Sequence, residues 1–234
     1  MRIFGFPVQI RPGFALFMLL IIVINGVPMG PWLAGSVAGF TLLHELGHAF
    51  AARRTGATAQ ISLDFLAGYA SFTPTRDLQR WERAGISLAG PFIQIATGCV
   101  VLLAFGVNPL SHDQFAADYW SFAIWWAGPA IGFFNLIPVL PLDGGNVAAE
   151  ILDYLSPGRG RNMMIKASPL LTAGAFIAMV FVDDLRPLAA FAAILLVLQL
   201  QTMSALAATS PDRRSFELEQ QRRLAAEAED TAWR

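Results

Sequence analysis

The sequence predicts an all-α polytopic membrane protein with about six transmembrane helices and a small β-strand or hairpin element at the cytosolic face. Composition gives the first indication, because 55% of the 234 residues are hydrophobic and only 14% are charged, whereas about a quarter of the residues of a soluble domain are charged. Long uncharged runs give the second, since stretches such as Pro12 to Leu43 exceed the roughly 18 to 20 apolar residues that cross a bilayer core. The distribution of basic residues gives the third.

The basic residues orient the predicted spans. If the N-terminus lies in the cytosol and the spans alternate, only Arg186 of the 16 basic residues falls on the outer side, in agreement with the positive-inside rule. We therefore expect an integral, multi-pass protein with both termini cytosolic, and the Ala- and Arg-rich composition favours a bacterial plasma membrane. The net charge of −1 argues against a nucleic-acid partner. The expected spans are about 13–30, 32–52, 84–107, 118–137, 167–182 and 187–207.

Three segments outside the spans define the expected domain organisation. Residues 1–12 are rich in β-branched and aromatic side chains, which predicts an N-terminal strand segment. Residues 57–75 alternate in hydrophobicity and then break at Gly68, so we expect a strand-bearing cytosolic loop within a six-span core at 13–208. Residues 209–234 mix Arg, Glu and Ala and are expected to form a charged cytosolic tail.

Two histidines and a glutamate interrupt the second span. His44 and His48 are four residues apart, so both imidazoles lie on one face of a helix and can bind one Zn²⁺, with Glu45 beside them to take a proton from water. Arg53 follows at the cytosolic end of the span, which places the site near the cytosolic leaflet. This pattern also occurs by chance in chains that bind no metal. Inside a span, however, each ionisable group costs about 3 kcal/mol, and a metal would account for all three residues.

Zinc needs a third protein ligand, and Asp143 is the best-placed candidate. It follows a stretch in which Pro138 and Pro141 interrupt a helix, and the two glycines after it permit unusual backbone. Broken backbone at membrane depth is tolerated only where protein or a water-filled cavity surrounds it. A helix that simply ends at the cytosolic face, with Asp143 as an N-cap, explains the stretch equally well. His112, the remaining histidine, lies in an outer loop.

The two motifs together resemble those of the site-2 protease family of intramembrane zinc metalloproteases. His44-Glu45-Leu46-Gly47-His48 is the first motif, and the stretch from Asn135 to Gly145 matches the family pattern N-x-x-P-x-x-P-L-D-G at every fixed position. The resemblance covers residues 1 to 155 and indicates a compact form without a PDZ or CBS domain.

The resemblance implies one zinc ion per chain, bound by His44, His48 and Asp143, with Glu45 as the general base. A transmembrane substrate must unwind before hydrolysis, and an exposed strand in the 57–75 loop can capture the extended segment. An ordinary hairpin that covers the second span explains this loop as well. The implied substrate-binding residues are Asn135, Gly68 and Gly90.

Two positions depart from the family pattern. Ala89-Gly90-Pro91 is usually followed by Asn three residues after the proline, where this chain has Gln94. Helix packing explains this glutamine at least as well as a role in the site. Asn146 stands where many relatives carry Arg, which leaves its contacts open.

The expected function is therefore zinc-dependent hydrolysis of peptide bonds within transmembrane segments of membrane proteins, as in regulated intramembrane proteolysis. The expected partners are a transmembrane protein substrate, a regulatory membrane protein and the lipid bilayer. Two alternatives belong to other classes: a catalytically silent scaffold that retains the protease fold, and a metal or ion transporter. The intact histidine, Glu45 and Asp143 set argues against the scaffold. The lack of further ionisable residues along the spans argues against the transporter.

Overall fold

The computed structural model describes residues 1–64, 68–182 and 186–208. It divides into two compact units, Met1–Met164 and a second unit that begins at Ile165. The predicted tail at 209–234 lies outside the described residues. Residues 65–67 of the predicted strand-bearing loop also lie outside them. The three-part organisation expected from the sequence stays a prediction.

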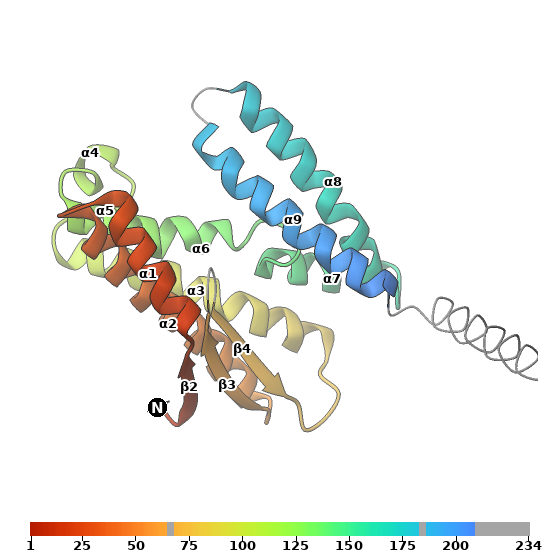
Figure 1. The fold of residues 1–234 in the computed structure, drawn as a ribbon. Helices are drawn as coiled ribbons and strands as arrows, with labels where there is room; N and C mark the ends of the chain where they lie inside the picture. The colour runs from red at the N-terminus through yellow and green to blue at the C-terminus, as the bar shows by residue number, and fades with distance from the viewer. Residues whose placement is uncertain (65–67, 183–185, 209–234) are drawn as a thin grey trace, which may run out of the picture. The chain divides into compact units, whose positions relative to one another are not determined.

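A small sheet lies at one end of the first unit (Figure 1). Its strands, in the spatial order β1-β2-β3-β4, are β1 (Arg2–Ile3), β2 (Phe6–Ile10), β3 (Thr58–Leu63) and β4 (Gly68–Thr73). β2 pairs in parallel with β3, and the other two pairings are antiparallel. Where one N-terminal strand was expected, the chain forms a hairpin, because Gly5 turns it with a φ of 88° that side chains disfavour. The predicted strand-bearing loop is the β3–β4 pair.

The sheet packs against the helix that carries the two histidines. Leu46 and Ala49 of this helix, α2 (Met29–Arg54), are 4% and 0% exposed. They share one core cluster with side chains of β2 and β3, namely Phe6, Val8, Ile61 and Leu63. Because Leu46 and Ala49 face the sheet, the sheet fixes the rotation of α2 about its own axis and turns the histidine face toward the helix α3 (Arg80–Ala104).

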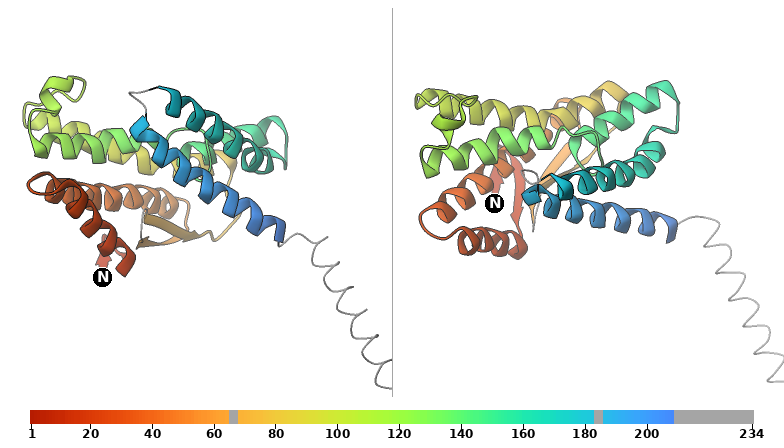
Figure 2. Two further views of the ribbon diagram at one scale, coloured as in Figure 1. Left: turned by 45° about the horizontal axis from the view of Figure 1, so that its top comes forward. Right: turned by 90° about the horizontal axis from the view of Figure 1, so that it is seen from above.

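Helices make up most of the described chain, as the sequence predicted. In the first unit, α2, α3 and the segment from α5 (Tyr119–Trp125) to α6 (Ile131–Phe134) lie side by side (Figure 2). The second unit holds most of α8 (Gly160–Phe181) and all of α9 (Arg186–Ala208), which are joined by a 2.9 Å hydrogen bond from Gln199 to Thr172. Besides α2, the helices are α1 (Pro12–Asn25), α3 (Arg80–Ala104), α4 (His112–Phe115), α5 (Tyr119–Trp125), the π-helix η1 (Trp126–Ala130), α6 (Ile131–Phe134), α7 (Asp143–Leu155), α8 (Gly160–Phe181) and α9 (Arg186–Ala208).

Glycines allow the helices of the first unit to cross closely. A Cβ on Gly47 of α2 would lie 2.6 Å from the Ala89 carbonyl oxygen of α3, and a Cβ on Gly98 of α3 would lie 3.1 Å from the Gly128 Cα of η1. The 2.6 Å distance is too short for a real side chain, and so is the 2.5 Å distance between a Cβ on Gly98 and Pro129 Cδ of η1. α3 is therefore in backbone contact with α2 on one side and with η1 on the other.

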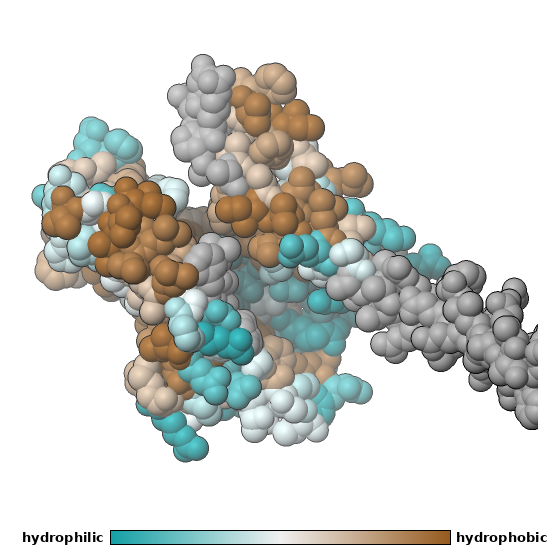
Figure 3. Space-filling model, in the orientation of Figure 1, coloured by the Kyte–Doolittle hydropathy of each residue, from teal (hydrophilic) through white to brown (hydrophobic). Residues whose placement is uncertain are grey.

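Two of the described helices, α3 and α8, are long and apolar enough to cross a membrane. α1 and the stretch Phe191–Ser204 of α9 are apolar but shorter. α2 is long enough, but His44, Glu45 and His48 lower its mean hydropathy. The predicted helices are thus present while the six-span topology is not confirmed. Apolar side chains gather on the surface of α1 (Figure 3), where Leu16 is 59% and Val23 is 70% exposed.

Candidate metal centre

Three predicted ligands come together at one point of the first unit. His44 and His48 lie one turn apart on α2, and their Nε2 atoms are 2.9 Å from each other. Asp143, the first residue of α7, places Oδ2 3.1 Å from His44 Nε2 and Oδ1 3.4 Å from His48 Nε2. The three ligand atoms lie within 4.8 Å of one another. Two imidazole nitrogens and a carboxylate oxygen are a usual donor set for a divalent metal, so this group could hold one.

The alternative role of Asp143, as a simple helix cap, does not match its position. The N-cap of α7 is Leu142, and its backbone is extended. Asp143 itself is helical, and both of its carboxylate oxygens face the histidines.

The proton on His48 can be placed from its hydrogen bond. His48 Nδ1 lies 2.7 Å from the backbone carbonyl oxygen of Ile86 on α3. A carbonyl only accepts, so Nδ1 carries the hydrogen, and the neutral ring presents a lone pair at Nε2. That lone pair faces the Asp143 carboxylate, which also only accepts when it is ionised. A cation between them would satisfy both groups, which is the observation that makes the site fit a metal.

Gly90 lies directly over the two imidazoles. A Cβ at this position would collide with His48 Nε2 and would lie 2.9 Å from His44 Nε2. The glycine therefore keeps the space next to the ligand atoms open. Its predicted contact with substrate stays a prediction.

The two glycines after Asp143 let the preceding loop fold back onto the start of α7. A Cβ on Gly144 would collide with the Leu136 carbonyl, and a Cβ on Gly145 would collide with the backbone of Val139. The Gly144 N–H also donates to the Asn135 carbonyl at 2.8 Å. This compact turn sets the position from which Asp143 reaches α2.

The remaining predicted site residues are placed as follows. Glu45 is only 4% exposed and follows His44 on α2. Asn135 is half-buried at the end of α6, and its backbone touches the start of α7. Gly68 is the first residue of β4 and pairs with Leu63. The roles assigned to these residues stay predictions.

Two residues that the motifs left open have defined surroundings. Gln94 is 2% exposed, and its Oε1 lies 2.7 Å from His44 Nδ1. The sequence singled it out as a departure from a family pattern and left a role in the site open beside helix packing, but it did not indicate a contact with His44. Asn146 lines a cavity of about 470 Å³ between β4, α3 and α7, together with Phe72, Ser87 and Asp153.

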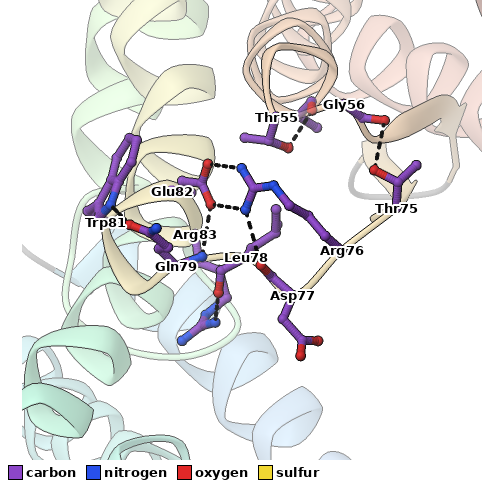
Figure 4. A network of polar contacts seen from close by, with 11 residues as sticks. Thr55, Gly56, Thr75, Arg76, Asp77, Leu78, Gln79, Trp81, Glu82 and Arg83 are labelled. Carbon is purple, nitrogen blue, oxygen red and sulfur yellow. Dashed lines mark hydrogen bonds and ion pairs between the residues drawn. The ribbon is translucent and has the colours of Figure 1, made fainter.

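A polar network holds the first turn of α3 (Figure 4). Arg76 donates two hydrogen bonds to the Glu82 carboxylate, at 2.8 and 2.5 Å, and the Gln79 N–H donates a third at 2.9 Å. The Arg76 guanidinium and then the Gln79 N–H lower the pKa of Glu82, which precedes the predicted span at 84–107, to about 2. The network fixes the start of the helix that carries Gly90.

The fold and the cluster define a helical protein with a small sheet and a group of residues that could hold a metal. No family model matches the chain. Its sequence is 25% identical over 177 residues to a proposed zinc metalloprotease of Synechocystis sp. and 27% identical over 154 residues to a zinc metalloprotease of Methanocaldococcus jannaschii. The matches cover 70% and 64% of this chain but 46% and 44% of the relatives, so the chain spans less than half the length of each curated relative.

The structure is similar to that of the site-2 protease from Methanocaldococcus jannaschii. The TM-score is 0.56 with 23% sequence identity, and the match covers 86% of this chain and 88% of the other. At this identity the likeness shows the fold. Together with the two named relatives it confirms the resemblance to site-2 proteases that the motifs predicted.

Proposed function

We propose that the chain is an intramembrane zinc endopeptidase of the site-2 protease type, which hydrolyses peptide bonds within transmembrane segments of membrane proteins. The observation that carries the proposal is the convergence of His44, His48 and Asp143 beside the buried Glu45. The names of the two sequence relatives support zinc as the metal and proteolysis as the reaction.

In this proposal each side chain of the site has a separate role in the hydrolysis of one peptide bond. Zinc held by His44, His48 and Asp143 supplies Lewis acidity toward water and toward a peptide carbonyl. The Glu45 carboxylate accepts a proton from the attacking water and later donates it to the nitrogen of the leaving amine. The Asn135 amide donates a hydrogen bond to the substrate, either to its backbone or to the oxygen of the scissile carbonyl.

The membrane setting belongs to the same proposal. We place six spans in a bacterial plasma membrane, with both termini cytosolic and the metal centre near the cytosolic leaflet. The apolar helices α3 and α8 and the exposed apolar surface of α1 support this placement. A substrate segment that has left its helical form would add to the edge of β4, where Gly68 begins the strand. The lipid bilayer and a regulatory membrane protein are the other proposed partners.

The test uses the zinc-loaded protein in proteoliposomes with a panel of internally quenched transmembrane peptides. We expect the wild type to cleave at least one peptide and Glu45→Gln to cleave it at least about 100-fold more slowly, since a general base contributes that much, while the variant keeps its zinc. Cleavage at the wild-type rate by Glu45→Gln would refute the assignment of the base. A wild type that binds zinc and cleaves nothing would favour the silent scaffold.

A further inference from the structure

We infer that Gln94 is a positioning residue that selects the tautomer of His44 and thereby presents the His44 Nε2 lone pair to the metal. The inference rests on the proposed metal site and adds to it a residue of α3 that lies in neither of the two motifs. It also gives a reason for the π-helix η1.

Gln94 is held between two partners. Its Oε1 lies 2.7 Å from His44 Nδ1, and its Nε2 lies 2.7 Å from the backbone carbonyl oxygen of Ala127 in η1. The side chain is 2% exposed, so water does not compete for either end of the amide.

The Ala127 carbonyl decides the direction of both hydrogen bonds. A glutamine amide has nearly the same shape in its two orientations and could present either its oxygen or its NH₂ group to a histidine. A carbonyl only accepts, so the NH₂ group must face Ala127 and the oxygen must face His44. That oxygen requires a hydrogen on His44 Nδ1. The neutral imidazole then has its lone pair at Nε2, the atom that lies 3.1 Å from Asp143.

The π-helix makes the Ala127 carbonyl accessible to Gln94. In a regular α-helix the N–H of Ile131 would donate to Ala127, four residues earlier. Here it donates to the carbonyls of Trp126 and Gly128 instead, so Ile131 does not compete with Gln94. The close contact of Gly98 with Gly128 brings η1 within reach of the Gln94 amide. Such π-turns are frequent at functional sites.

The two histidines are therefore oriented by the same helix through different groups. Ile86, which accepts from His48, uses its backbone, which no substitution removes. Gln94 uses its side chain, so the orientation of His44 depends on this one residue. Groups that orient metal-binding histidines in this way typically change metal affinity by 10- to 100-fold when they are removed.

The first measurement is zinc affinity in the detergent-purified full chain. Gln94→Met keeps the length of the side chain but removes the acceptor, and we expect zinc to bind about 10- to 100-fold more weakly. Gln94→Glu restores the acceptor, and in its neutral form it also donates to Ala127, so affinity should return to within a few-fold of wild type. A role limited to packing α3 against η1 predicts no such rescue. The matched control is Gln199→Met, which removes a buried glutamine whose bond to Thr172 joins α8 to α9.

The second measurement does not depend on metal. The chain has three histidines, so a ¹⁵N-histidine NMR spectrum of the metal-free protein at alkaline pH, with His112→Asn for assignment, reports the tautomer of each ring. We expect Nδ1–H for His44 in the wild type and a shift toward Nε2–H in Gln94→Met. An Nε2–H ring at His44 in the wild type, or wild-type zinc affinity in Gln94→Met, would overturn the inference. A wild type that binds no zinc but shows Nδ1–H would instead refute the metal proposal and leave the tautomer assignment standing.

Discussion

Arg83 of α3 and Glu150 of α7 form a bidentate ion pair, in which Nε–Oε1 is 2.6 Å and Nη2–Oε2 is 2.7 Å. The pair ties the helix that carries Gly90 and Gln94 to the helix that begins at Asp143. Its side chains are 42% and 20% exposed, so water screens the charges.

Glu150→Gln should loosen this connection without destroying the site. We expect the free energy of unfolding to fall by no more than about 1 kcal/mol, as for other partly exposed pairs, and zinc affinity to fall a few-fold. Denaturant unfolding and zinc titration measure the two effects. The control is Asp153→Asn, which weakens the single 3.2 Å contact between Arg80 and Asp153. Complete loss of zinc binding in Glu150→Gln would contradict this limited role of the ion pair.

Asp143→Ala should abolish tight zinc binding, because two imidazoles alone leave the ion one protein ligand short. Metal analysis of the purified protein should give about one zinc per chain in the wild type and little or none in the variant. Asp153→Ala removes a carboxylate from the same helix, outside the cluster, and should leave the zinc content unchanged. Equal zinc in all three proteins would mean that the metal is bound elsewhere.

Gly90→Ala should disrupt the ligand set, because the added methyl group would collide with His48 Nε2 and press on His44 Nε2. We expect at least about a 100-fold loss of zinc affinity, the upper end of the effect of misplaced ligands. Gly85→Ala is the matched control on the same helix, since a Cβ there meets nothing within 4 Å. It should bind zinc normally and gain up to about 1 kcal/mol of stability from helix propensity. Wild-type affinity in Gly90→Ala would contradict the described contact.

The Arg76–Glu82 contact predicts a defined response to acid. The pKa of Glu82 falls from 4.5 to about 2 on folding, so its charge stabilises the folded protein above pH 4.5, and this stabilisation is lost as the pH falls from 4.5 toward 2. Metal-free Arg76→Gln should therefore be less stable than wild type at neutral pH, and the difference should shrink through that window. Chemical unfolding at a series of pH values measures it. A constant difference down to pH 2 would rule out this origin.

The residues of the metal centre could be predicted because each lies in a local pattern. The spacing of His44 and His48 places both rings on one face of any helix, and the prolines and glycines around Asp143 indicate a broken helix. These local patterns do not predict which helices contact one another. The bond from Gln94 to His44 depends on how closely α3 crosses α2, and the sequence does not encode this distance in a local signal.

The differences in the fold have similar reasons. The N-terminal segment reads as one strand because β1 contributes only Arg2 and Ile3, too few residues for an alternating pattern. The mean hydropathy of α2 is too low to mark it as a membrane span, because the helix contains His44, Glu45 and His48. The only feature of the sequence that indicates the π-helix η1 is Pro129, which lacks the backbone N–H that each residue of a regular helical turn donates.

The parallel pairing of β2 with β3 restricts the number of times that the chain between them can cross a membrane to an even number. Val8 lies beside Ile61 in one sheet, so the chain before α1 and the chain after α2 must emerge on the same side of any membrane. α1 and α2 therefore either both cross or both stay out, and an odd number of crossings between them is impossible. This restriction on the topology follows from strand pairing alone and uses neither the hydropathy of the helices nor the distribution of basic residues. Accessibility labelling of single cysteines introduced at Gln9 and Gln60 would test this restriction, and we expect both cysteines to be labelled from the same side of the membrane.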